Sequence, residues 1–267
     1  MLPVPYEHTV TYGRGTRAGP KAIIKASKQV ETFDEELGIE AAEKVCIYTE
    51  NPLKLNGFSE KEVQNLLEKS TEKILKANKI PVLIGGEHSI SIASVKACRK
   101  VYNNLSVLQI DAHGDLRNSY KGTKYSHASV MRRILEICPA VQVGIRNMSE
   151  EGYKFAEKTG QLKKIHFAKT ANREWGMKIG KIIKQLSDQV YITIDVDGLD
   201  PGIVPTTGTP EPGGLGWWEV LDLLKAVAKQ KRVVGFDLVE LSPVKGLHAA
   251  DFACAKLIYK FISYIVA

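Results

Sequence analysis

Two apolar runs that end in acidic residues place the strongest constraint on the fold of this chain. The first leads into the sequence DAHGD at residues 111–115, and the second leads into DVDGLDP at residues 195–201. Residues two apart in an extended chain point to the same side. Each run therefore directs alternate metal-ligand side chains to one side, namely Asp111, His113 and Asp115 in the first and Asp195 and Asp197 in the second.

Buried carboxylates are costly unless a cation accompanies them or their pKa shifts. A bound metal ion removes that cost, and carboxylate together with imidazole suits a divalent ion such as Mn²⁺. The two runs therefore predict a metal site at the ends of two strands.

Short β-rich runs alternate with amphipathic stretches along the whole chain. We expect strands at residues 44–48, 81–84, 105–110, 140–145, 164–167, 190–196 and 232–238. We expect helices at residues 20–28, 59–79, 89–101, 129–137, 149–159, 175–186, 217–229 and 249–264. Regular alternation of this kind predicts an α/β fold with three layers, α/β/α. Its sheet would be mostly parallel, with about seven or eight strands and helices on both faces.

Two more apolar runs end in polar side chains of the same kind. One leads into GGEHS at residues 85–89, which contains His88, and the other continues through residues 237–243, which contain Glu240. Open parallel sheets bind ligands at the carboxyl ends of their strands. We therefore expect four strand ends to bring His88, Glu240 and the two acidic groups to one edge of the sheet. Glu87 and Asp200 are interpreted as structural residues.

Six motifs together identify a resemblance. They are GGEHS at 85–89, DAHGD at 111–115, SHAS at 126–129, IDVDGLDP at 194–201, GTPEPGG at 208–214 and DLVELSP at 237–243. In this order they resemble the ureohydrolase family, which includes arginases, agmatinases and related amidinohydrolases. The resemblance covers the chain from about Val4 to its end.

The resemblance implies a centre with two Mn²⁺ ions per chain and hydrolysis of a guanidino group to urea. One ion would be held by His88, Asp111, Asp115 and Asp195. The other would be held by Asp111, His113, Asp195 and Asp197, so that Asp111 and Asp195 bridge the ions. Two dications would lower the pKa of a shared water to near neutral.

Catalytic roles follow from the same resemblance for His127, Glu240 and Asp115. His127 would move protons near the leaving amine, and Glu240 would accept hydrogen bonds from the guanidinium. Both residues would therefore also bind the substrate.

The stretch at residues 121–127 favours an agmatinase over an arginase, because it lacks the Asn- and Ser-rich sequence that arginases carry there. The expected reaction converts agmatine to putrescine and urea, a step of polyamine biosynthesis. The alternatives are N1-aminopropylagmatine or another guanidino substrate, a formimidoylglutamase, and an arginase. Lys121 and Lys124 would either face solvent or meet the tail of the substrate.

A non-catalytic member of the family is a further alternative, although all six ligand residues are present. The net charge of +7 raises the question of nucleic-acid binding. We expect none, because lysines and arginines are spread through the chain and interleaved with glutamates. No apolar run is long enough for a membrane span.

The chain has 267 residues, of which 44% are hydrophobic, which is enough for a full α/β core. We expect a single domain over residues 1–267. Relatives usually carry a strand before residues 4–6, so the N-terminal edge strand is expected to be truncated or missing. The four scattered cysteines are interpreted as reduced and buried, which favours the cytoplasm. The resemblance implies a homo-oligomer, a trimer or a hexamer.

Overall fold

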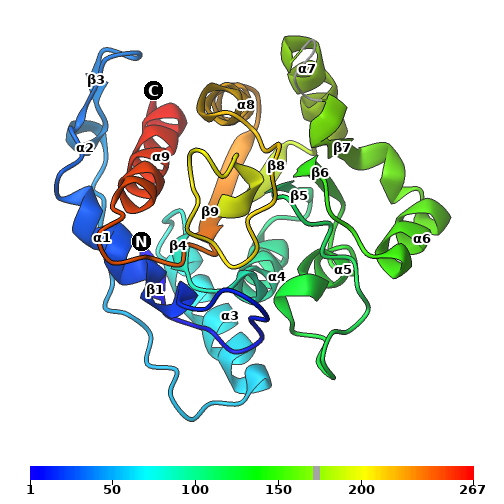
Figure 1. Cartoon of the computed structure of the whole chain (residues 1–267). Helices are drawn as coiled ribbons and strands as arrows, with labels where there is room; N and C mark the ends of the chain where they lie inside the picture. The colour runs from blue at the N-terminus through cyan, green and yellow to red at the C-terminus, as the bar shows by residue number, and fades with distance from the viewer. Residues whose placement is uncertain (171–174) are drawn as a thin grey trace.

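A parallel sheet lies at the centre of the molecule (Figure 1). The computed structural model describes residues 1–170 and 175–267. Within these residues seven strands pair in the order β1-β4-β9-β8-β5-β6-β7, each parallel to its neighbour. Their bounds are β1 (Leu2–Val4), β4 (Val82–Gly85), β5 (Leu105–Ile110), β6 (Ala140–Ile145), β7 (Ile165–Phe167), β8 (Gln189–Asp195) and β9 (Arg232–Val239). A separate antiparallel pair joins β2 (Phe33–Asp34) to β3 (Ile39–Glu40).

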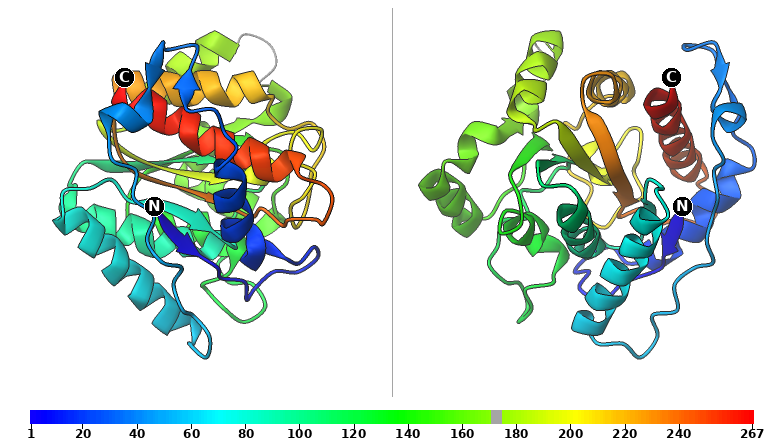
Figure 2. Two further views of the ribbon diagram at one scale, coloured as in Figure 1. Left: turned by 90° about the vertical axis from the view of Figure 1, so that its left-hand side faces the viewer. Right: turned by 180° about the vertical axis from the view of Figure 1, so that it is seen from behind.

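Helices cover both faces of this sheet, as Figure 2 shows from the side. One layer contains α1 (Gly19–Ser27), α7 (Trp175–Gln185), α8 (Trp217–Gln230) and α9 (Ala249–Val266). The opposite layer contains α3 (Glu60–Lys76), α4 (Ser91–Val101), α5 (Val130–Ile134) and α6 (Glu150–Thr159). A short helix, α2 (Ala41–Lys44), precedes α3 in sequence and is not part of this layer. The predicted α/β/α architecture is confirmed. None of the described helices is long and apolar enough to cross a membrane.

Strand β8 shows how the sequence assigns side chains to the two layers. Val190, Ile192 and Ile194 pack into the core beneath α8 and α9. Tyr191, which lies between them in sequence, packs into the core on the other face. The run is apolar at consecutive positions because both faces of a central parallel strand are buried.

Helix α3 begins where the sequence indicates. Ser59 caps the helix and accepts a hydrogen bond from the backbone N–H of Glu62, and the Glu62 carboxylate accepts the N–H of Ser59. This reciprocal pair satisfies two N–H groups that the first turn would otherwise leave without partners.

The strand expected at residues 44–48 is wrong. Lys44 ends α2, and the chain beyond it lies alongside β1 without forming a ladder. The N-terminal amine of Met1, the residue before β1, donates to the Tyr48 carbonyl, and the Glu50 N–H donates to the Met1 carbonyl. The same stretch leaves Cys46 exposed, which corrects the expectation that all four cysteines are buried. The N-terminal edge strand is present as β1, which has three residues, and β7 forms the other edge of the sheet.

Candidate metal centre

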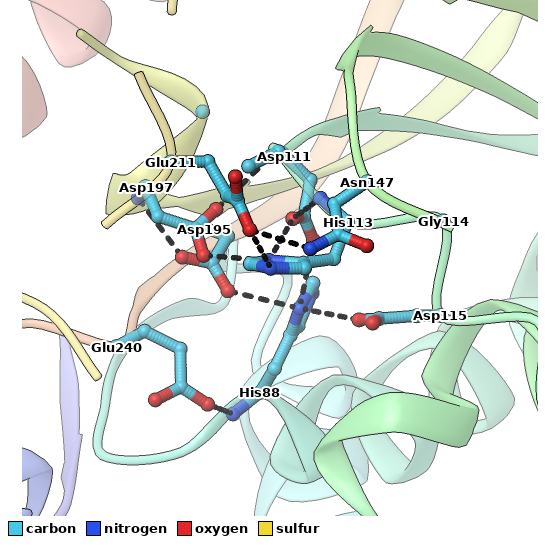
Figure 3. Close-up of polar contacts among 12 residues, drawn as sticks. His88, Asp111, His113, Gly114, Asp115, Asn147, Asp195, Asp197, Glu211 and Glu240 are labelled. Carbon is cyan, nitrogen blue, oxygen red and sulfur yellow. Dashed lines mark hydrogen bonds and ion pairs between the residues drawn. The ribbon is translucent and has the colours of Figure 1, made fainter. Parts of the chain in front are cut away.

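Four neighbouring strands, β4, β9, β8 and β5, end at one edge of the sheet and position the candidate site (Figure 3). Ile110 of β5 pairs with Ile194 of β8, so Asp111 and Asp195 follow at the same level. The chain beyond β4 passes close to the N-terminal segment, and a Cβ on Gly86 would lie 1.9 Å from the Tyr6 carbonyl oxygen. Glycine at this position therefore allows the tight approach that places His88 in the site.

The six predicted ligands form two overlapping sets. In the first set, His88 Nδ1 lies 3.2 Å from Asp111 Oδ2, 3.2 Å from Asp115 Oδ2 and 3.3 Å from Asp195 Oδ2. In the second set, His113 Nδ1 lies 2.8 Å from Asp197 Oδ2 and 3.7 Å from Asp111 Oδ1. Asp111 is therefore shared by both groups of potential ligand atoms, whereas Asp195 belongs to the first group only.

The hydrogen bonds of His88 show that a metal ion fits the first set. The Thr193 hydroxyl donates to Asp237 Oδ1 at 2.6 Å, so it accepts from His88 Nε2, which lies 2.8 Å away. Nε2 then carries a proton, while the buried Nδ1 has no hydrogen-bond partner and faces three carboxylates. A lone pair surrounded by negative charge requires a cation, and neutral imidazole with carboxylates is a suitable donor set.

Without a metal ion the centre retains protons instead. Burial opposes the charged form of His113, but hydrogen bonds and charge from Asp111 and Asp197 prevail and raise its pKa to about 12. Burial and the charge of Asp111 raise the pKa of Asp115 to about 6. Burial also raises the pKa of Asp195, and repulsion by Asp197 and Asp111 adds to this effect. A divalent ion would compete with these protons for the same ligand atoms.

Metal affinity is therefore expected to increase with pH. His113 keeps its proton until the pH approaches its raised pKa, so each ion that binds must displace protons. We expect the apparent association constant to rise roughly tenfold per pH unit for each proton displaced, between about pH 6 and pH 8. Calorimetric titration with Mn²⁺ in buffers of different ionisation enthalpy measures both the constant and the protons released. Equal affinity at both ends of this range would contradict the prediction.

Hydrogen bonds within the protein orient the ligand carboxylates. Asp111 accepts from Gln109 Nε2 and from the backbone N–H of His113, both at 2.6 Å. Asp197 Oδ1 accepts from the backbone N–H of Ala112 at 3.0 Å. One sequence signal points to Gln109: it is a polar residue in an apolar strand, two positions before Asp111 and therefore on the same face. Gln142 extends this buried chain by donating to Gln109 Oε1.

Two site residues have a left-handed backbone. The φ angle is 49° at Asp115 and 68° at Glu240, a region that residues other than glycine rarely adopt. Glu240 is buried, and its Oε1 accepts a hydrogen bond of 2.6 Å from the backbone N–H of His88. Burial and the nearby charge of Glu87 raise the pKa of Glu240. The chain changes direction at these two residues, which follow β5 and β9.

A cavity of about 190 Å³ opens beside the ligand sets. Its walls include Asp195, Asp197, Glu240 and His127. Burial, together with the charge of His88, lowers the pKa of His127 to about 4. Neutral His127 is therefore the form present near neutral pH.

The cavity wall distinguishes between the two positions that the sequence left open for Lys121 and Lys124. Arg117 and Tyr120 line the cavity, whereas Lys121 and Lys124 do not. Glu211 was not predicted from the sequence, and its Oε1 atom lies 3.8 Å from His113 Nε2. Asp200 accepts the N–H groups of Gly202 and Gly214 and so holds a turn, as its interpretation as a structural residue implies.

A parallel sheet between two helical layers, with overlapping Asp and His ligand sets at its strand ends, defines an α/β protein with a candidate metal centre. The family model described as the Arginase family matches residues 1–263, and the chain belongs to this family.

Individual relatives cover nearly the whole chain. The N(1)-aminopropylagmatine ureohydrolase of Thermus thermophilus is 41% identical over 98% of this chain and 88% of its own length. The agmatinase of Pyrococcus horikoshii is 34% identical over 98% of this chain and 90% of its own length. The crystal structure of the agmatine ureohydrolase of Thermoplasma volcanium superposes with a TM-score of 0.88 at 29% identity, covering 99% of this chain and 88% of that one.

Proposed function

We propose that this chain hydrolyses the guanidino group of a small cationic substrate and releases urea. The observation that carries the proposal is the pair of ligand sets that share Asp111 at the wall of a cavity also lined by Glu240. Membership of the Arginase family and the names of the relatives support the same reaction class.

His88, Asp111, Asp115 and Asp195 would hold one divalent ion, and Asp111, His113 and Asp197 would hold the other. The family resemblance adds Asp195 to the second set as well. We propose Mn²⁺ as the metal, because carboxylate and imidazole ligands suit it and the family resemblance implies it. When bound, two such ions lower the pKa of a shared water and polarise the substrate.

Charge selects a cationic substrate at this centre. The four aspartates Asp111, Asp115, Asp195 and Asp197 balance two divalent ions, so Glu240 adds a net negative charge to the cavity wall. A guanidinium presents planar N–H donors that a carboxylate accepts in pairs. Glu240 could accept such a pair with both oxygens, because Oε1 uses only one of its two lone pairs for the N–H of His88.

His127 would act as the general acid and base. Its imidazole lies at the cavity wall and is neutral near neutral pH, so it can accept a proton and return it to the leaving amine. Asp115 would contribute to catalysis by orienting the reacting water beside His88.

Agmatine is the proposed substrate, with putrescine and urea as products and polyamine biosynthesis as the setting. N1-aminopropylagmatine is a second candidate, favoured by one specific observation. Three relatives named N(1)-aminopropylagmatine ureohydrolase are 38–41% identical to this chain and a fourth is 32% identical, whereas three relatives named agmatinase are each 34% identical. Lys121 and Lys124 lie outside the cavity wall formed by the described residues, which favours the interpretation that they face solvent.

A urea-release screen of the Mn²⁺-loaded protein tests this proposal. We expect agmatine and N1-aminopropylagmatine to have higher kcat/KM values than arginine, because both lack the α-carboxylate of arginine. The ratio of the kcat/KM values for the two polyamine precursors then decides between the candidates. Preference for arginine, or no urea from any guanidino compound, would contradict the proposal.

Further parts of the proposal rest on family resemblance and composition. We propose that residues 1–267 act as a single domain in the cytoplasm, within a homo-oligomer of three or six copies. Sedimentation velocity of the purified protein measures the number of copies.

A further inference from the structure

Glu87 is a fully buried carboxylate beside the metal centre that does not belong to either ligand set. Its Oε2 atom accepts the backbone N–H groups of His8 at 2.5 Å and Thr9 at 2.7 Å. Its Oε1 atom accepts the hydroxyls of Thr9 at 2.9 Å and Ser89 at 2.6 Å. Four donors therefore fix this carboxylate and, with it, the N-terminal segment that carries Thr9.

Thr9 connects this carboxylate to His127. The Thr9 hydroxyl oxygen lies 2.9 Å from His127 Nδ1 and also accepts the backbone N–H of His127 at 3.1 Å. A threonine hydroxyl has a single proton, and here that proton is donated to Glu87. The oxygen can therefore only accept from the His127 ring, which requires a proton on Nδ1.

This arrangement determines which ring nitrogen of His127 is basic. With the proton on Nδ1, the lone pair is on Nε2, for which the described residues supply no hydrogen-bond partner. Because Thr9 does not line the cavity, it acts on a substrate only through His127.

We propose that Glu87 and Thr9 are positioning residues that hold His127 as the Nδ1–H tautomer with Nε2 free to exchange protons with the substrate. This inference rests on the proposed hydrolysis of a guanidino group. In that reaction the water oxygen becomes the carbonyl oxygen of urea, and the C–N bond to the amine breaks. The amine nitrogen takes up both protons of the water. His127 Nε2 carries one of them, because it can accept a proton and donate it without a change at Nδ1.

The test uses three variants of the full chain. Thr9→Val keeps the side-chain shape but removes the hydroxyl, and Thr9→Ser restores a hydroxyl at the same position. Thr16→Val is the matched control in the same N-terminal segment, because Thr16 is also buried but its hydroxyl has no hydrogen-bond partner among the described residues. We expect Thr9→Val to lower kcat about 100-fold, the scale of general acid–base catalysis, with little change in KM. Thr9→Ser and Thr16→Val should remain close to the parent.

Equal loss of kcat in Thr9→Val and Thr16→Val, or failure of Thr9→Ser to restore kcat, would overturn the proposal, since either result indicates only a packing role. Melting temperatures measured in parallel identify variants that are merely unfolded.

A second readout is independent of catalysis. Long-range ¹H–¹⁵N spectra of the ¹⁵N-histidine-labelled, metal-free full chain report the tautomer of each ring, and His127→Gln assigns the His127 signals. We expect the Nδ1–H form in the parent and its loss in Thr9→Val. An Nε2–H form in the parent overturns the inference. If the urea screen fails but the Nδ1–H form is observed, the proposed function is wrong while the positioning of the ring is correct.

Discussion

Replacing Asp111 by alanine is expected to empty both metal sites and to abolish hydrolysis. Asp111 is the carboxylate common to the two ligand sets, with Oδ2 facing His88 and Oδ1 facing His113. Its removal leaves each set without one anion. We expect a loss of kcat/KM on the order of 10³-fold or more, because metal ions contribute several kcal/mol to reactions of this type.

Elemental analysis of the purified variants gives the metal content directly. We expect two ions per chain in the parent, close to none in Asp111→Ala, and about one in His88→Ala, because His88 belongs to the first set only. Asp222→Ala is the matched control, since Asp222 is exposed on α8. Two tightly held ions in Asp111→Ala would show that this residue does not bridge.

Replacing Glu240 by glutamine is expected to preserve both ions but to remove most activity. Glu240 lines the cavity without joining either ligand set, so its charge acts on the substrate. The amide is nearly isosteric and can still accept the N–H of His88, so the local structure should persist. Breaking a buried ion pair costs roughly 3–5 kcal/mol, which corresponds to a loss of kcat/KM of about 100-fold or more.

Metal content, kcat and KM separate the possible causes of such a loss. Retained ions with a large loss of kcat/KM would support the contact with the guanidinium. Glu43→Gln, at an exposed position of α2, controls for the removal of one negative charge from the protein. A Glu240→Gln variant as active as the parent would exclude this role.

The sequence predicted the central strands well for a physical reason. Residues 105–110 and 140–145 have the bounds that the sequence indicated, because central strands are buried on both faces and read as unbroken apolar runs. Residues 44–48 have a similar apolar composition, yet they pass beside β1 without pairing into the sheet. Composition alone does not reveal whether a partner edge is available to such a segment.

The sequence predicted those site residues that lie at or just beyond the ends of strands. Asp111 and Glu240 come directly after a strand, Asp195 is the last residue of β8, and His88 follows the end of β4 by three positions. The parallel topology brings these strand ends together. Thr9 could not be found in this way. It contacts His127 across 118 positions from a loop with no recognisable pattern, and only the fold reveals that contact.

The left-handed backbone at Asp115 and Glu240 has a consequence for laboratory evolution. Such a conformation costs a residue with a side chain roughly 1 kcal/mol or more, whereas glycine adopts it freely. A library selected only for heat resistance should therefore accumulate glycine at these two positions. The selected variants would have higher melting temperatures but lower kcat. Retention of the two acidic residues would instead record selection for activity at the expense of stability.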